Sequence, residues 1–246
     1  MDRIRQAATI AAGAVLIGLG ILNFVYRDSL LTWQPTPHDA PWKVSFAIVS
    51  GILLIVGGAG LFVASWRTRA AMLASGWIGL WALLLHVPQV VMAPNVGSLL
   101  GVAESSFMAL GLATLTGCFD SDRRAMFLRL GVGLSAVIFG VSHFVYADFT
   151  AQMVPAWLPD RLGLAYLTGA IHALTGACLL TGLRVRVAAT IEALMMASFV
   201  LLLHIPGVAG APHDRMQITM LGIASLLTIA AWLLASWGPL KRYAVD

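Results

Sequence analysis

The sequence contains eight apolar runs, each long enough to cross a lipid bilayer as a helix. They lie at about 7–26, 44–65, 70–92, 98–118, 130–146, 162–182, 188–209 and 217–237. A transmembrane helix needs about 20 predominantly apolar residues. Because 59% of the 246 residues are hydrophobic and only 11% are charged, the composition excludes both a soluble globule and a disordered chain. The sequence therefore predicts an all-α, polytopic membrane protein with eight transmembrane helices.

Basic residues are distributed unequally between the two sides of the predicted membrane. With the N-terminus inside, the cytoplasmic segments contain Arg3, Arg5, Arg67, Arg69, Arg123, Arg124, Arg129, Arg184, Arg186, Lys241 and Arg242. The outer loops contain Arg27, Lys43, Arg161 and Arg215. By the positive-inside rule, both termini are cytoplasmic, in a multi-pass protein of the inner (cytoplasmic) membrane. The formal charge of +4 is then an orientation signal, and no nucleic-acid partner is expected.

Two stretches of the chain occur twice. FVYRD at 24–28 returns as FVYAD at 144–148, an offset of 120, and LLLHVPQVVMAPN at 83–95 returns as LLLHIPGVAGAPH at 201–213, an offset of 118. We therefore expect two four-helix repeats, residues 1–120 and 121–246. Because each repeat has an even number of spans, both insert with the same orientation, as parallel repeats about an axis along the membrane normal.

His86 and His204 occupy matching positions in these repeats. Each lies about six residues, or roughly 9 Å, below the outer end of its helix, and a proline follows two residues later. A proline within a helix leaves the carbonyl four residues before it unbonded, here that of Leu84 or Leu202. The kink predicts a pocket in which an unprotonated imidazole binds a metal ion, a haem iron or a quinone oxygen. The alternative is a neutral histidine that is hydrogen-bonded to a neighbouring helix.

Two further titratable side chains lie in the outer parts of predicted spans. His143 precedes the second FVY sequence, where the first half has Asn23, and an unperturbed histidine titrates near neutral pH. Glu104 lies about as deep as His86. It is a candidate proton carrier or oxygen ligand for a metal; the alternative is a carboxylate stabilised by a helix N-terminus.

His172 lies near mid-membrane, on a helix face that it shares with Thr168, Thr175 and Gly176. This face either belongs to a proton path or packs against another helix. Glu192 lies near the inner start of the seventh span, and we expect it at the membrane interface. Tryptophans near the span boundaries are predicted interface anchors: Trp33, Trp42, Trp66, Trp157 and Trp237.

No motif of a self-contained catalyst is present. The sequence lacks a nucleophile elbow, a Walker loop, a dinucleotide fingerprint and the CxxC and CxxCH motifs. Cys118 and Cys178 are interpreted as packing residues. Hydrolytic or thiol-redox catalysis by the chain alone is therefore not expected.

The second half contains FGVSHFVYADF, then VPAWLPDRLGLAYLTGAIHALTGACLLTGLRVRVAA, then a helix with LLLHIP. This unit resembles the DoxX-like family of small membrane proteins, and the first half resembles it more loosely. The resemblance implies a four-helix membrane bundle and a link to quinone-dependent sulfur oxidation and terminal oxidase complexes, from which the family takes its name. It supports roles for His143, His172 and His204, and for His86 through the repeat.

The leading hypothesis is a membrane subunit or partner of a quinone-linked redox system, working with other membrane redox subunits. Its quinone or metal pocket would lie near the outer face and be lined by His86, His204, His143 and Glu104, with His172 as a further cofactor-binding candidate. One alternative is a small-molecule transporter or binding module with a polar cavity between the repeats. The other is a non-catalytic membrane scaffold.

Overall fold

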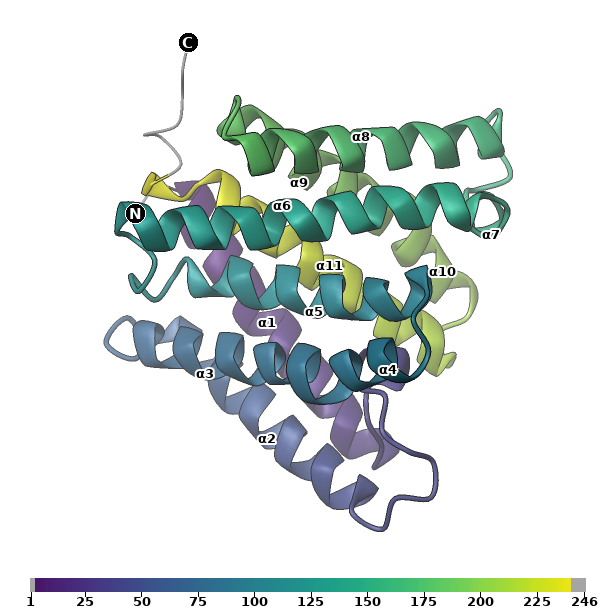
Figure 1. Cartoon of the computed structure of the whole chain (residues 1–246). Helices are drawn as coiled ribbons and strands as arrows, with labels where there is room; N and C mark the ends of the chain where they lie inside the picture. The colour runs from purple at the N-terminus through teal and green to yellow at the C-terminus, as the bar shows by residue number, and fades with distance from the viewer. Residues whose placement is uncertain (1–2, 240–246) are drawn as a thin grey trace.

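The computed structural model describes residues 3–239, and its regular elements in that range are all helical (Figure 1). Lys241 and Arg242, used above for orientation, lie outside the described residues. The α-helices are α1 (Arg3–Tyr26), α2 (Lys43–Phe62), α3 (Arg67–Leu80), α4 (Val87–Met92), α5 (Val96–Ala113), α6 (Asp122–Val145), α7 (Ala147–Met153), α8 (Arg161–Thr181), α9 (Val185–Phe199), α10 (Ile205–Gly210) and α11 (Arg215–Ala235). A 3₁₀ turn, η1 (Leu31–Trp33), and two π turns, η2 (Trp81–His86) and η3 (Val200–His204), complete the set.

Eight helices within residues 3–239 are long and apolar enough to cross a membrane. Two of them are composite rods, Arg67–Met92 from α3 to α4 and Val185–Gly210 from α9 to α10. The prediction of an all-helical protein is confirmed for these residues, and so is the prediction of eight helices that could span a membrane.

The spans form a closed ring in which α5 and α11 also meet across the centre. In Figure 1, α8, α6, α5, α3 and α2 follow one another from top to bottom, with α9, α11 and α1 behind them. Helix α1 packs against α11, and α6 packs against α5. The fourth span of each half of the chain therefore lies beside the first span of the other half.

The most extensive helix pairs, α1 with α2 and α6 with α8, approach each other at glycines. A Cβ atom at Gly20 would lie 2.7 Å from the carbonyl oxygen of Gly51, and one at Gly140 would lie 2.7 Å from that of Gly169. Small residues permit this close backbone contact between helices in lipid, where van der Waals packing drives association.

We expect Gly20→Ala to lower the free energy of unfolding by about 1–3 kcal/mol, because the added methyl group forces α1 and α2 apart. Gly18→Ala is the matched control on the same helix, since a Cβ atom there meets nothing within 4 Å. It should be neutral or stabilising by up to about 1 kcal/mol. Unfolding of both variants in detergent measures the difference, and equal stability would contradict this account of the interface.

The residues before Pro88 and Pro206 form π turns in both halves of the chain. The amide of Val87 donates to the carbonyl of Ala82, and that of Ile205 donates to Val200, each five residues back. A proline ring clashes with the carbonyl four residues before it, and a widened turn accommodates that clash. The helix distortion predicted before each proline is present in both halves. It is a π turn that ends at His86 in the first half and at His204 in the second.

An ion cluster joins the α1–α2 loop to the start of α11. Asp28 Oδ1 lies 3.0 Å from Lys43 Nζ, and Asp28 Oδ2 lies 3.1 Å from Arg215 Nη1. The Arg215 guanidinium also donates to the Ser29 carbonyl at 2.6 Å and covers the ring of Tyr26. Burial opposes ionisation of Asp28, but hydrogen bonds from Lys43 and Arg215 outweigh it and hold its pKa below the usual range.

Because the pKa of Asp28 is lower in the folded protein, its contribution to stability is present above the unfolded pKa of about 3.9 and is lost as pH falls through the folded value. We expect Asp28→Asn to cost on the order of 1 kcal/mol at pH 7. This difference should shrink toward zero as the pH falls below about 4. Unfolding measured across pH tests this, and a difference independent of pH would contradict it.

Candidate functional site

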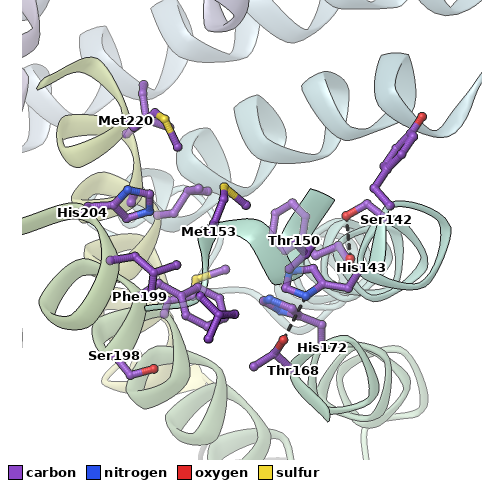
Figure 2. Close-up of a pocket in the computed structure, with 18 of the residues that line it drawn as sticks. Ser142, His143, Thr150, Met153, Thr168, His172, Ser198, Phe199, His204 and Met220 are labelled. Atoms are coloured by element: carbon purple, nitrogen blue, oxygen red, sulfur yellow. Dashed lines mark hydrogen bonds between the residues drawn. The ribbon is translucent and has the colours of Figure 1, made fainter. Parts of the chain in front are cut away.

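A cavity of about 370 Å³ lies among α5, α6, α7, α8, α9 and α11. This volume lies within the range of small-molecule pockets. Its walls are mainly apolar and include Phe139, Phe149, Met153, Met196, Phe199 and Met220. Four of the five predicted site residues line it: Glu104, His143, His172 and His204. Figure 2 shows His204 on one side and His143 with His172 on the other.

His143 is held by α8. Its Nδ1 lies 2.9 Å from Thr168 Oγ1 and 3.3 Å from the carbonyl oxygen of Ala165 (Figure 2). A carbonyl only accepts, so Nδ1 carries the hydrogen; Thr168 accepts from it and donates its own hydrogen to the Leu164 carbonyl at 2.9 Å. The ring stacks on Phe199 with centroids 6.1 Å apart. Nε2 makes no hydrogen bond within the described chain.

His172 forms a buried pair with Glu192. Its Nδ1 lies 2.6 Å from Glu192 Oε1, and Thr175 Oγ1 donates to Glu192 Oε2 at 2.5 Å. Only 3% of the His172 side chain and 1% of the Glu192 side chain are exposed. The rings of His172 and His143 are 5.1 Å apart between centroids. His143, Thr168 and His172 therefore line one wall of the cavity, and Glu192 lies buried behind His172.

The expected place of Glu192 at the membrane interface is wrong. The side chain lies two helical turns into α9 and points into the bundle, where it accepts hydrogen bonds from α8. The sequence contained a signal for this pairing. Glu192 is the lone acidic residue of its apolar run and His172 the lone histidine of the preceding one, and isolated polar groups in neighbouring spans tend to find each other.

Trp33 connects the cavity to the other repeat-related histidine. Its indole Nε1 donates to Glu104 Oε2 at 2.7 Å, and its carbonyl lies 3.1 Å from His86 Nε2. His86 is 2% exposed, packs against Gly101 and does not line the cavity. His86 therefore takes the structural alternative of a histidine hydrogen-bonded inside the bundle, whereas Glu104 faces the cavity.

The interface role predicted for Trp33 is also wrong, because the 3₁₀ turn η1 carries its side chain into the bundle. Trp33 is half-buried, and Trp237 is fully buried with its indole Nε1 3.0 Å from Asp120 Oδ1. The other three tryptophans are exposed, as interface anchors require: Trp42, Trp66 and Trp157.

His204 follows the π turn η3 and lines the cavity near Met153 and Met220 (Figure 2). Its imidazole makes no hydrogen bond to any described residue. Among residues 3–239, no group of three or more His, Cys, Asp or Glu side chains is placed to hold a metal ion. The predicted metal site therefore lacks a set of ligands in this part of the chain. The unbonded nitrogens of His143 and His204 are suited instead to hydrogen-bonding an organic ligand.

The matching positions in the first half carry different side chains. Asn23, which aligns with His143, donates to Gln34 Oε1 at 3.1 Å, and Gln34 Nε2 donates to Ser50 Oγ at 2.5 Å. At the offset of 118, Leu54 and Ala74 stand where the second half has His172 and Glu192, and both are fully buried. At these aligned positions, the second half therefore has titratable side chains and the first half has amide or apolar ones.

Residues 132–235 match a protein-family profile described as a domain of unknown function (DUF8561). The matched segment contains His143, His172, Glu192 and His204, and leaves out Trp33 and Glu104. No curated protein and no solved structure matches the chain significantly. The similarity therefore covers most of the cavity wall and assigns no activity to it.

Proposed function

We propose that this chain is a quinone-binding membrane protein that acts as a subunit or partner of a quinone-linked redox system. One observation carries the proposal: Glu104, His143, His172 and His204 converge on an apolar cavity of about 370 Å³ among helices that are apolar enough to span a membrane.

A quinone matches this cavity in three respects. It dissolves in the bilayer, so it reaches a site within the spans. Its flat ring packs against aromatic and thioether side chains such as Phe199, Met153 and Met220. Its two oxygens, carbonyl oxygens in the oxidised form and hydroxyls in the reduced form, lie on opposite sides of the ring, and polar side chains stand on opposite walls of the cavity, His204 on one and His143 on the other. Few, well-placed polar groups in an apolar pocket are typical of such ligand sites.

We further infer that residues 1–120 and 121–246 are parallel four-helix repeats related to the DoxX-like family. Supporting this are the paired π turns, the glycine contacts of α1 with α2 and of α6 with α8, and the packing of each half's fourth span against the first span of the other half. The arginine distribution supports cytoplasmic termini in the inner membrane. The cavity then lies toward the outer face, and electrons pass between the quinone and a membrane redox partner.

The test is to purify the protein in mild detergent, extract bound lipids and analyse them for quinones. Duroquinone and durohydroquinone are then titrated separately, with quenching of tryptophan fluorescence as the signal, because Trp33 lies in the cavity wall. We expect saturable binding of at least one form with one site per chain. Absence of a copurified quinone, together with no saturable binding of either added form, would overturn the proposal.

A further inference from the structure

We propose that the cavity selects the reduced form of the ligand, a quinol, and that one quinol hydroxyl donates a hydrogen bond to Nε2 of His143. The hydroxyl takes the place that the side chain of Gln34 fills in the first half of the chain. This inference rests on the proposed function and adds to it a redox state, an orientation and an anchoring residue.

The first half shows what occupies the matching place. The Gln34 side chain is fully buried, and its Oε1 accepts from Asn23 Nδ2 at 3.1 Å and from the Leu30 amide at 2.9 Å. Its Nε2 donates to Ser50 Oγ. Asn23 and Ser50 align with His143 and Thr168. A flat polar group that both donates and accepts therefore bridges these two positions in the first half.

The second half lacks this group. The offset of 120 that aligns FVYRD with FVYAD continues through the next residues and places Val154 opposite Gln34. Val154 lines the cavity and carries no polar side-chain atom. His143 and Thr168 consequently hydrogen-bond each other. Where the Gln34 side chain fills the space in the first half, the second half has an open cavity, and His143 and Thr168 lie at its edge.

The hydrogen-bond directions decide which ligand form this end of the cavity accepts. Nδ1 of His143 donates, so Nε2 of the neutral ring offers a lone pair, and Thr168 has used its only hydrogen on the Leu164 carbonyl. His172 donates from Nδ1 to Glu192. The free Nε2 of His143 therefore needs a ligand that donates a hydrogen bond. A quinol hydroxyl donates a hydrogen bond, and a quinone oxygen cannot.

The opposite wall does not reverse this preference. His204 has both ring nitrogens unbonded within residues 3–239, so a neutral ring supplies either a donor or an acceptor and suits both forms. Selection therefore comes from the His143 side.

The experiment compares three tetramethylbenzene probes under anaerobic conditions: durohydroquinone, duroquinone and the 1,4-dimethoxy analogue, which has no hydrogen to donate. We expect the wild-type protein to bind durohydroquinone about tenfold or more tightly than either other probe, since one hydrogen bond to an otherwise unpaired buried acceptor is worth about that factor. His143→Phe keeps the ring stacked on Phe199 and should bring the ratio to about one without loss of duroquinone affinity. His204→Phe is the control, in which both affinities fall and the ratio persists.

A second variant tests whether the ligand occupies the place of Gln34. Val154→Gln places the first-half side chain at the aligned position in the cavity. We expect it to weaken binding of all three probes at least about tenfold, with a thermal midpoint no lower than that of the wild type. Equal affinity for the two redox forms, a preference that survives His143→Phe, or unchanged binding in Val154→Gln would overturn this inference and leave the proposed function standing. Absence of saturable binding by every probe in the wild type would overturn the proposed function, and the inference with it.

Discussion

Replacing Glu192 with alanine should destabilise the protein by about 3–5 kcal/mol, among the largest effects expected of a single substitution. The carboxylate accepts from both His172 Nδ1 and Thr175 Oγ1 at a position that is 1% exposed. Without it, the imidazole N–H at Nδ1 is left inside the bundle with no acceptor from the protein. Unfolding in detergent, followed by circular dichroism, measures the loss.

The control is the double variant His172→Leu/Glu192→Ala. It recreates the first-half residues Leu54 and Ala74, which are both fully buried in one hydrophobic cluster. The Thr175 hydroxyl still donates to the Ile171 carbonyl at 2.9 Å. We therefore expect the double variant to recover most of the stability lost in the single variant. A single variant as stable as the wild type, or a double variant less stable than the single one, would contradict the pairing.

Ala224→Trp should abolish measurable quinone and quinol binding. Ala224 is on α11 and lines the cavity, so an indole there occupies much of the 370 Å³ that the ligand needs. A ligand that cannot be buried loses the apolar contact from which most of its affinity comes. The measurement is the fluorescence titration with duroquinone and durohydroquinone.

Leu174→Trp is the matched control for this substitution. Leu174 is on α8 and is 66% exposed on the outer surface of the bundle, so the same indole added there leaves the cavity open. We expect binding equal to that of the wild type. If Ala224→Trp binds as well as Leu174→Trp while both are folded, the ligand lies elsewhere.

The eight spans could be predicted because the bilayer fixes both the length and the polarity of a spanning helix. The π turns were signalled by Pro88 and Pro206, since a proline removes a donor and forces the preceding turn to adapt. The gathering of Glu104 with three histidines was only partly predictable. Depth along a helix can be counted from the sequence, which placed Glu104, His143 and His204 in the outer parts of their spans but His172 deeper, near mid-membrane.

The rotation of each helix could not be read in the same way. A span that is apolar on nearly every side has no strong face, so the periodicity does not direct Glu192 toward His172, and the only signal for their pairing is that each is the isolated polar residue of its kind in its run. The path of the α1–α2 loop could not be predicted from the sequence either. It carries Trp33 and Gln34 into the bundle, and this separates His86 from the cavity although its local sequence is nearly that of His204. Whether a loop folds into the bundle depends on tertiary contacts, and a local sequence pattern does not reveal these.

The central claim, that the cavity is a quinone site, is tested most directly by photoaffinity labelling with an azidoquinone followed by mass spectrometry of the labelled peptides. We expect label on cavity residues, among them Met153, Phe199 and Met220, and its suppression by excess durohydroquinone. Label confined to outward-facing residues such as Leu174, or label on the cavity that excess durohydroquinone does not suppress, would contradict it.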